Sequence, residues 1–304
     1  MRQPDLPGIA DAIALLKNGD IVALPTETVY GLAADATNNA AVARIYAAKG
    51  RPNYNPLIVH VSNEAMAETL VEIPPLARDL MRRFWPGALT LVLPLKHGVP
   101  IAALVTAGLP TLAVRCPAHP AMQAVIAGLG RPIAAPSANA SGRISSTTAT
   151  HVRASLGDRV PFILDDGPTA AGLESTIVAV DGDRATLLRP GAIPAEVLGI
   201  VLETAGPAIV APGQLASHYA PDRPLRLNAP TATAQEFHIG FGAIAGDLNL
   251  SENADLAEAA AGLFAALHTA EASGKPLIAV APIPAHSLGI AINDRLTRAA
   301  VPPG

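Results

Sequence analysis

The sequence predicts an α/β protein: a twisted mixed sheet with flanking helices, followed by a small second α/β domain. Helical and strand patterns alternate along the chain, which is typical of α/β folds. Half of the residues are apolar but only 3% are aromatic, so Ala, Val, Ile and Leu must build the core. With 304 residues, the chain is long for one core and comfortable for two domains.

The first expected elements are a helix, a strand pair and a second helix. Residues 9–19 have amphipathic helical periodicity that ends at Gly19. Residues 20–35 read as strand, polar turn and strand, and residues 38–50 read as a helix that ends at Gly50. The alternation continues with strands expected at 57–61, 88–94, 111–115, 132–136, 162–166, 175–180 and 185–191, and with helices expected at 74–85, 120–130, 148–157 and 194–206.

A break in this pattern separates two parts of the chain. Residues 206–223 are rich in Pro, Gly and Ser, which is the composition of a linker. We predict a first domain at 1–204, a linker at 205–224 and a small α/β domain at 225–304. The segments of this small domain that show helical or strand patterns are 237–244, 253–274, 276–282 and 289–300.

Composition excludes several classes of protein. The longest uncharged stretch in the middle of the chain, residues 98–114, is short and interrupted by Pro100 and Pro110, so it cannot form one membrane-spanning helix. The N-terminus lacks the apolar core of a signal peptide, and we expect a soluble, cytoplasmic protein without a membrane partner. The single Cys116 allows no internal disulfide and no cysteine-based metal cage. The formal net charge of −4 predicts no strong autonomous binding of nucleic acid.

The stretch KGRPNYNPLIVH, residues 49–60, places positive charge and two prolines directly before an apolar strand. Lys49 lies in the last turn of the preceding expected helix, and Arg51 lies just past its end. A helix C-terminus stabilised by basic residues and a stiff polyphosphate-binding loop both explain this pattern. In the strand that follows, His60 shares a face with Ile58, and it is either a hydrogen-bonded core residue or a ligand contact.

Other polar residues follow the ends of expected strands. Thr26, Glu27 and Thr28 are either ordinary turn residues or lie at the mouth of a cleft. Arg115 ends an apolar strand, where an unpaired charge is costly to bury, so it must pair with an acid of this chain or of a ligand. Arg189 ends a similar strand before a Pro-Gly turn.

The segment 135–147, APSANASGRISST, follows a short strand at its carboxyl end, where open α/β sheets bind ligands. Its hydroxyl and backbone N–H groups suit a phosphate, and a plain capping loop is the alternative. Asp165 and Asp166 hold a metal or start a turn. The chain has no P-loop, GxGxxG, HExxH, kinase or GxSxG motif. The remaining residues predict a site for a polyanion and a small polar molecule at the rim of a sheet.

Eight stretches carry a family resemblance across about the first 220 residues: PTETVYGLAADA, KGRPNYNPLIVHV, FWPGALTLVL, VRCPAHP, APSANASGRISST, ESTIV, LLRPGAI and SHYAP. In this order they strongly resemble the YrdC-type L-threonylcarbamoyladenylate synthases. The C-terminal IAINDRLTRAA resembles the extra domain in the long form of that family. The resemblance implies a YrdC-like first domain and a small Rossmann-like C-terminal domain.

The resemblance also implies a reaction. ATP, bicarbonate and L-threonine give threonylcarbamoyl-AMP and pyrophosphate, and separate tRNA-threonylcarbamoyl transferase proteins use the product to modify an adenosine beside the anticodon. Mg²⁺ is expected to be held by the phosphates, and we identify no metal-binding residues.

The family pattern assigns roles to residues of this chain. Lys49 and Arg51 are the expected catalytic residues, because they bring the anionic reactants together. No side chain is assigned as a general base. The implied ATP contacts are Lys49, Arg51, Asn55, Thr111, Ser137, Asn139, Ser145, Arg189 and Tyr219. The implied L-threonine contacts are Thr28, His60, Arg115, Ala135 and Ser175, with Arg115 pairing with the carboxylate.

In the long family members the linker folds over the active site. We therefore expect Tyr219, together with His218, to close on the nucleotide and to shield the adenylate from water. Two other functions are the alternatives. A non-catalytic RNA-binding module fits poorly with the negative net charge, and a hydrogenase-maturation-type enzyme fits poorly with a single cysteine.

Overall fold

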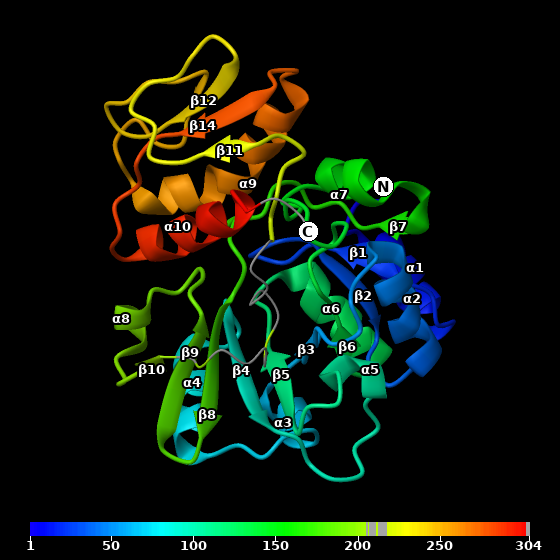
Figure 1. The fold of residues 1–304 in the computed structure, drawn as a ribbon. Coiled ribbons are helices and arrows are strands. Elements are labelled where there is room, and N and C mark those ends of the chain that lie inside the picture. The colour runs from blue at the N-terminus through cyan, green and yellow to red at the C-terminus, as the bar shows by residue number, and fades with distance from the viewer. Residues whose placement is uncertain (205, 207–210, 212–217, 302–304) are drawn as a thin grey trace.

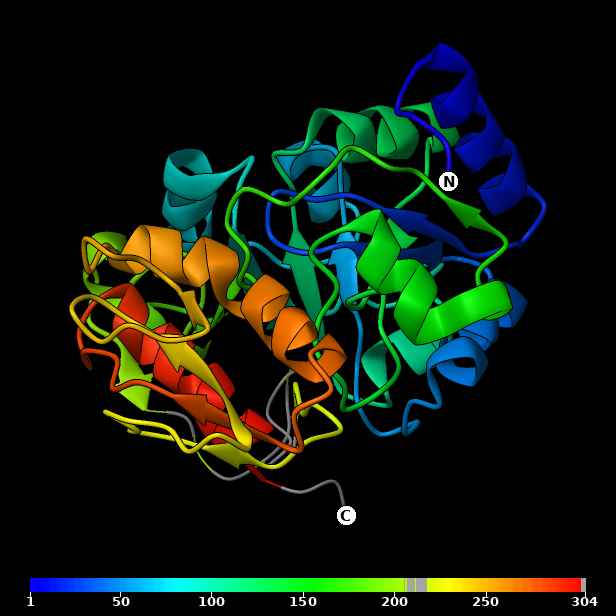
Figure 2. The same cartoon turned by 90° about the horizontal axis from the view of Figure 1, so that it is seen from above.

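The computed structural model describes residues 1–204, 206, 211 and 218–301. In this part of the chain, a ten-stranded mixed sheet and a four-stranded parallel sheet form two helix-covered lobes that lie side by side (Figures 1 and 2). The predicted fold class, a mixed α/β sheet followed by a small α/β domain, is confirmed.

The large sheet places β3 and β5 at its centre, and they run parallel with His60 opposite Arg115. Both residues end their strands, so their side chains reach the same edge region of the sheet. In spatial order the strands are β10 (Glu203–Thr204), β9 (Arg184–Arg189), β8 (Thr176–Asp181), β4 (Leu89–Pro94), β5 (Thr111–Arg115), β3 (Ile58–His60), β6 (Ile133–Ala134), β2 (Gly31–Asp35), β1 (Val22–Leu24) and β7 (Phe162–Ile163).

Alternation along the strands divides the core between the two faces of this sheet. Val22 and Leu24 pack in the cluster formed with α1 (Leu6–Lys17) and α6 (Pro120–Leu129), whereas Ala23 points into the main core on the other face. The remaining helices of this lobe are α2 (Asn39–Lys49), α3 (Glu64–Glu68), α4 (Pro75–Phe84), α5 (Ala103–Thr106), α7 (Ala149–Leu156), the short 3₁₀ helix η1 (Gly157–Arg159) and α8 (Ala195–Leu198).

Some expected elements differ from the structure. The helix expected at 194–206 ends at Leu198, because Gly199 adopts a left-handed φ of 64°, and the short strand β10 follows. The strand expected at 162–166 covers only Phe162–Ile163. Helices α3 and α5 were not predicted, because they are short helices of one turn or little more.

The small lobe contains a parallel sheet in the order β11 (Leu225–Arg226), β14 (Leu277–Val280), β12 (Glu236–Gly240) and β13 (Leu248–Asn249). Its two helices, α9 (Leu256–Ala272) and α10 (Leu288–Ala299), lie between this sheet and the large lobe (Figure 1). Val29, Ile144 and Leu173 of the large lobe join the apolar cluster of α9 and α10. The two lobes therefore share a core, while the domain boundaries at 204 and 225 remain a prediction.

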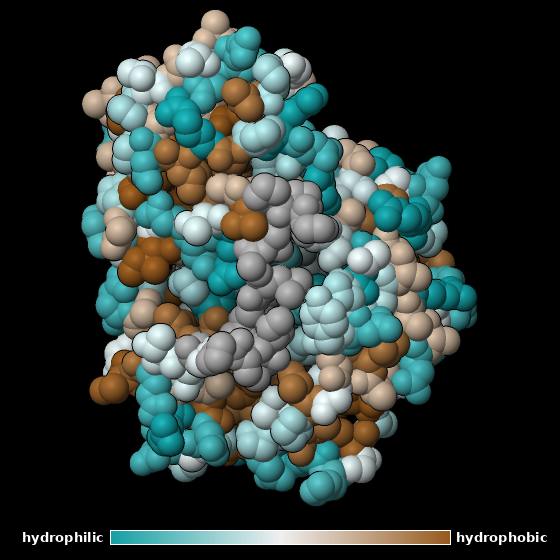
Figure 3. All heavy atoms as spheres, viewed as in Figure 1, coloured by the Kyte–Doolittle hydropathy of each residue, from teal (hydrophilic) through white to brown (hydrophobic). Residues whose placement is uncertain are grey.

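Hydrophilic and hydrophobic residues are interspersed on the face of the molecule shown in Figure 3. Among the described residues, no helix has the length and apolar character needed to cross a membrane. Of the predicted linker, 205–224, the structure describes only residues 206, 211 and 218–224, and the rest of the predicted lid lies outside the described residues.

Candidate active site

A cavity lies where β3 and β5 end, on the sheet face that carries Ile58 and His60. Val59 points into the main core on the opposite face, which confirms the predicted orientation of this strand. Eight of the predicted site residues line the cavity: Thr28, Arg51, His60, Arg115, Ala135, Ser137, Ser175 and Arg189. The cavity lining lacks six others: Lys49, Asn55, Thr111, Asn139, Ser145 and Tyr219.

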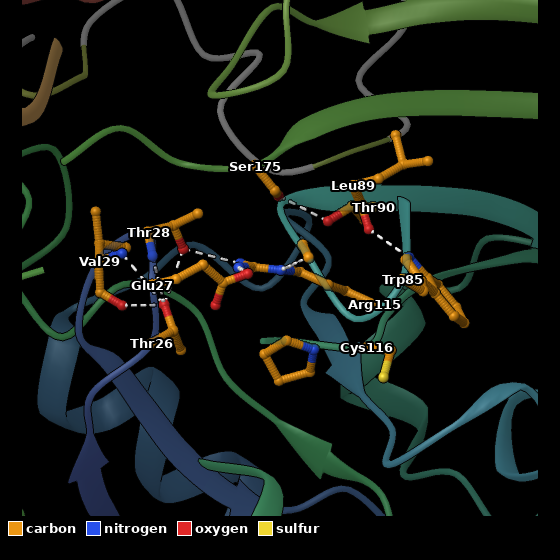
Figure 4. Close-up of polar contacts among 12 residues, drawn as sticks. Thr26, Glu27, Thr28, Val29, Trp85, Leu89, Thr90, Arg115, Cys116 and Ser175 are labelled. Carbon is orange, nitrogen blue, oxygen red and sulfur yellow. Dashed lines mark hydrogen bonds and ion pairs between the residues drawn. The ribbon is translucent and has the colours of Figure 1, made fainter. Parts of the chain in front are cut away.

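Arg115 is held in place by protein groups on three sides (Figure 4). Its Nε donates to Gly87 O at 3.1 Å, and its Nη1 donates to Thr28 Oγ1 at 2.9 Å. Its Nη2 lies 2.6 Å from Glu27 Oε1. Of the two partners that the sequence left open for Arg115, the structure supplies an acid of this chain. One hydrogen of Nη2 and one hydrogen of Nη1 then remain to meet a ligand.

Two threonines fix the position of this ion pair (Figure 4). Thr26 Oγ1 donates its hydrogen to Val29 O at 2.6 Å, so the 2.8 Å contact between Thr26 Oγ1 and Thr28 Oγ1 must be donated by Thr28. Thr28 Oγ1 in turn accepts from Arg115. Both threonines are almost fully buried. The segment after β1 is therefore a rigid part of the cavity wall and not a solvated turn.

His60 is buried at the wall of the cavity, and its Nδ1 has no hydrogen-bond partner among the described residues. Burial and the Arg115 charge lower the pKa of His60 to about 3, so the ring is neutral near pH 7. A neutral ring with a free nitrogen can accept a hydrogen bond from a hydroxyl group.

Ser175 connects the opposite wall to the sheet. Its Oγ lies 2.7 Å from Thr90 Oγ1 (Figure 4). The same oxygen accepts from Arg189 Nη2 at 3.2 Å. Arg189 also donates to Ser175 O through Nε and Nη2, at 3.2 and 2.9 Å. Thr90 was not predicted, because a single threonine inside the apolar strand β4 gives no functional signal in the sequence.

Lys49 binds the loop after β6 from behind the cavity. Its Nζ donates to Ser137 O at 2.6 Å and to Asn139 O. Burial and the Arg51 and Arg159 charges hold the pKa of Lys49 well below its usual value. Asn139 Nδ2 donates to Ala140 O and Arg143 O, at 2.9 and 2.8 Å, while its buried Oδ1 has no partner within the described chain.

Arg51 reaches the cavity from the loop after α2. Its Nε donates to Asn55 O at 3.1 Å and its Nη2 to Pro56 O at 2.7 Å. Burial lowers the pKa of Arg51 to about 10. Asn55 is buried, and its Oδ1 has no partner in the described part of the chain. Thr111 lies at the start of β5, at the opposite end of the strand from Arg115.

A buried network joins the cavity to the small lobe. Glu174 lines the cavity, accepts from Ser145 Oγ at 2.5 Å, and accepts from Arg295 Nε of α10 at 2.8 Å. The guanidinium of Arg295 lies 5.2 Å from the ring centre of Tyr219, and Tyr219 packs against Phe264 of α9. Tyr219 thus belongs to the core of the small lobe, while His218 faces the cavity.

The charges around the cavity favour an anionic ligand. Arg51, Arg115 and Arg189 line it, and Lys49 lies just behind. Two carboxylates lie near these cations. Glu174 is paired with Arg295 of the small lobe, and Glu27 is paired with Arg115. Clustered buried cations are costly to desolvate, and a polyanion relieves that cost. The described residues contain no group of three or more His, Cys, Asp or Glu side chains that suits a metal ion.

Three residues of the site carried too weak a signal to be assigned from sequence. Glu27 was noted at a cleft mouth but not paired with Arg115, and Glu174 and Arg295 were not assigned any role. Their pairs join residues far apart along the chain, so no local pattern indicates them. A charged residue inside the buried face of the predicted C-terminal helix was the available clue for Arg295.

Comparisons with known proteins find relatives along the whole chain. Residues 14–191 match the Sua5/YciO/YrdC family model, described as telomere recombination, and residues 192–301 match the model described as threonylcarbamoyl-AMP synthase, C-terminal domain. The chain is 42% identical to the threonylcarbamoyl-AMP synthase of Bacillus subtilis (strain 168), over 97% of this chain and 93% of the relative. It is 38% identical to that of Pyrococcus abyssi (strain GE5 / Orsay), over 95% and 92% of the two chains.

Solved structures are also similar to this chain. The crystal structure of P. abyssi Sua5 complexed with L-threonine has a TM-score of 0.88 and 36% identity, and the match covers 96% of this chain and 94% of that one. The structure of E. coli YciO has a TM-score of 0.55 at 19% identity, and it covers 62% of this chain and 92% of that one, which is a likeness of fold alone.

Proposed function

The chain belongs to the Sua5/YciO/YrdC family and carries the C-terminal domain of threonylcarbamoyl-AMP synthases, and we propose that its cavity joins ATP, bicarbonate and L-threonine into threonylcarbamoyl-AMP and pyrophosphate. Its activity is that of a nucleotidyltransferase in tRNA modification. The observation that carries the proposal is the cluster of buried cations around one cavity, Lys49, Arg51, Arg115 and Arg189, in a chain of net charge −4.

ATP is proposed to bind along the loops that follow α2 and β6. Arg51 and Arg189 supply planar guanidinium groups for phosphate oxygens, and Lys49 supplies a point charge from behind. The free amide oxygens of Asn55 and Asn139 offer acceptors for the hydroxyl or amino groups of the nucleoside. Thr111, Ser137, Ser145 and Tyr219 stay in this set as predictions.

L-Threonine is proposed to bind between β3, β5 and the segment after β1. Arg115 Nη2 and the remaining hydrogen of Nη1 receive the carboxylate, and Thr28 orients them. The neutral His60 accepts the hydrogen bond of the threonine hydroxyl. Ala135 and Ser175, which line the same cavity, close the pocket.

The chemical step brings two anions together. A carbamate oxygen formed on the threonine nitrogen attacks the α-phosphorus of ATP, and pyrophosphate leaves. Like charges repel, so the surrounding arginines lower the barrier by neutralising both reactants and holding them in line. The carbamate oxygen is already anionic, so this attack needs no side-chain base.

Mg²⁺ is proposed to enter with ATP. The nearby oxygen donors are the amide groups of Asn55 and Asn139, and carboxylates free of cation partners are missing from the described wall. This donor set fits a metal that keeps phosphate and water ligands. When bound, the ion would offset charge on the leaving pyrophosphate.

The linker is proposed to close the cavity. His218 already lies in its wall, and Tyr219 anchors it to the small lobe through Phe264 and Arg295. A closed cavity excludes water from an adenylate that hydrolyses readily. The product is proposed to pass to a separate tRNA-threonylcarbamoyl transferase, because the net charge of −4 gives this chain no overall positive field for tRNA.

Release of pyrophosphate from ATP tests the proposal. We expect release that requires both L-threonine and bicarbonate. Release that proceeds without threonine, or that carbamoyl phosphate supports in place of both co-substrates, would contradict it. Tight RNA binding without any pyrophosphate release would instead favour a non-catalytic binding module.

A further inference from the structure

The ion pair between Glu27 and Arg115 leaves hydrogen-bonding capacity unused. Glu27 Oε1 lies 2.6 Å from Arg115 Nη2. Glu27 Oε2 is buried as well, and it has no hydrogen-bond partner among the described residues. The pair therefore presents one spare carboxylate oxygen beside a cation, next to the cavity that Arg115 lines. Buried polar groups in this state favour a ligand that completes them.

Glu27 also borders a second cavity of about 190 Å³. Thr26 lines both cavities, so this segment forms the wall between them. The second cavity also contains His119, whose Nε2 lies 3.3 Å from Asp166 Oδ2, and the Asp166 side chain is 43% exposed. His119 Nδ1 is buried without a partner in the described chain. Glu27, His119 and the partly exposed Asp166 thus line the same cavity.

Adjacent charges of opposite sign match the head group of an α-amino acid, whose ammonium and carboxylate share one carbon atom. Resting on the function proposed above, we propose that Glu27 binds the ammonium group of L-threonine, beside the carboxylate on Arg115, and takes the proton that the amine must lose before carboxylation. Glu27 is then a catalytic residue for the first half of the reaction.

The proton balance of that half-reaction requires such a group. The ammonium nitrogen first gives one proton to the Glu27 carboxylate. Its freed lone pair forms a bond to the carbon of bicarbonate, a C–O bond breaks, and the hydroxide leaves as water with a second proton from the nitrogen. The products are the carbamate and water, and one proton remains on Glu27. This proton passes to solvent through the second cavity, past His119 and Asp166.

The other candidate bases at the cavity suit this role less well. Both oxygens of Glu174 already accept hydrogen bonds, from Ser145 and Arg295. Burial and the Arg115 charge lower the pKa of His60 to about 3, and burial continues to act when a ligand neutralises Arg115.

In Glu27, unlike in His60, burial acts in the same direction as the loss of the Arg115 charge. Burial on its own raises the pKa of Glu27, and the Arg115 charge, with nearby backbone groups, outweighs it in the empty site. Once threonine's carboxylate offsets the Arg115 charge, one of the groups that lower this pKa acts less strongly, and the carboxylate becomes a better base. The other titratable groups that face Glu27 are Cys116, His119 and Asp166.

Comparing the affinities of two ligands, one with and one without the amine, tests whether Glu27 recognises the ammonium group of threonine. The probes are L-threonine and (R)-3-hydroxybutanoate, which keeps the carboxylate and hydroxyl of threonine but lacks the amine. By calorimetry, Glu27→Gln should weaken threonine binding at least about tenfold and leave hydroxybutanoate binding unchanged or improved. Equal losses for both ligands, or no loss for threonine, would overturn the proposal. Glu72→Gln, at an exposed position, is the matched control.

The pH dependence of threonylcarbamoyl-AMP formation tests the proton transfer. Glu27→Gln should be strongly impaired near pH 7, and its deficit relative to wild type should shrink at least about tenfold by about pH 9.5, where threonine loses its amine proton in solution. Glu27→Asp, which keeps the carboxylate, should retain part of the activity at pH 7. A deficit that stays constant across this range indicates a structural role and overturns the proposal.

Two further comparisons cover a Glu27→Gln variant that does not fold and a wild-type protein that forms no product. If Glu27→Gln does not fold, wild-type protein alone decides, because it must bind threonine more tightly than hydroxybutanoate, and equal affinities would refute the ammonium contact. If the wild type forms no threonylcarbamoyl-AMP, the proposed function fails on its own account. A wild type that forms the product alongside an equally active Glu27→Gln variant refutes only the role of Glu27.

Discussion

Substitution of Arg51 tests the proposed ATP site. It is 8% exposed, it lines the cavity, and its hydrogen bonds go to two backbone carbonyl groups of its own loop. A guanidinium buried in this way next to Arg189 is stabilised when phosphate oxygens approach. The charge of Arg51 should therefore contribute more to ATP binding than to threonine binding.

We expect Arg51→Ala to raise the dissociation constant for ATP at least about tenfold, because a charge-assisted contact is lost, and to change threonine binding much less. Lys49→Ala should act in the same direction, with an additional loss of stability, since Ser137 O and Asn139 O lose their donor. Calorimetric titration with ATP and with threonine measures both effects. The exposed residues Lys17 and Arg82 supply control substitutions. Unchanged ATP affinity and turnover in both variants would refute the assignment.

Buried histidines make the stability of the protein depend on pH. Burial lowers the pKa of His60 and of His218 from 6.5 to about 3. The native state binds fewer protons than the unfolded state, so this stability is fully present above pH 6.5 and is lost as pH falls toward about 3.

Each of these histidines should lower the free energy of unfolding by about 1.4 kcal/mol per pH unit within that window. Urea unfolding at pH 7 and at about pH 5 measures the slope. His60→Gln, which cannot titrate, should flatten it. A variant with the wild-type slope would show that His60 is not the buried neutral group described here.

The helix α10 stabilises the active site from the small lobe. Its Arg295 is fully buried, pairs with Glu174 and Asp294, and lies against the ring of Tyr219. Arg295→Met should cost about 3–5 kcal/mol, because it leaves the buried Glu174 charge without its main partner.

The double variant Glu174→Gln/Arg295→Met should recover a large part of this loss, since no isolated charge remains. Urea unfolding of the two variants measures the coupling. Arg298→Ala, which removes a more exposed i,i+4 ion pair of the same helix with Asp294, is the control and should cost about 1 kcal/mol or less. Arg295→Met that unfolds like this control would contradict the role of α10.

Helices and strands that depend on local sequence patterns were predicted from the sequence, and those that depend on tertiary contacts were not. The alternation in residues 57–61 correctly placed Ile58 and His60 on the cavity face, because strand side chains point to opposite faces by geometry. The helix expected at 194–206 was wrong, since Gly199 ends it early and a two-residue strand follows. Strands as short as β10, β11 and β13 depend on a neighbouring strand and leave too few residues for a pattern.

Eight of the residues predicted from sequence line the cavity, but the sequence did not indicate which of them pair with each other. Arg115 was correctly expected to need an acid, yet nothing in its own segment identified Glu27, because the contact arises only when β5 packs beside the segment after β1. For the same reason the contact between Arg295 and Glu174, and with it the connection of the small lobe to the cavity, became visible only in the structure.

The two lobes act as one unit in the described structure. Beyond the shared core, Arg143 of the loop after β6 pairs with Glu271 of α9 at 3.1 Å, and His268 Nε2 lies 3.1 Å from Ser145 O. The ring of His268 also stacks on that of His151, with centroids 3.9 Å apart. The small lobe therefore supports the loop proposed to hold the nucleotide, in addition to anchoring Tyr219.

A chain cut after Thr204 should form threonylcarbamoyl-AMP at least about a hundredfold more slowly than the full chain, because Glu174 loses Arg295 and the cavity loses His218. The cut retains β10, so the large sheet stays complete. Product formation by the purified fragment measures the effect, and circular dichroism checks its folding. A folded fragment with the rate of the full chain would show that the second lobe and linker do not support catalysis.

Mass spectrometry of the product tests the central claim most directly. The protein is incubated with ATP, L-threonine and ¹³C-bicarbonate. We predict threonylcarbamoyl-AMP that carries the heavy carbon in its carbamoyl group, together with pyrophosphate, and that disappears when either threonine or bicarbonate is omitted. An adenylate without the heavy carbon, or ATP cleavage that yields no threonine-containing adenylate, would contradict the account.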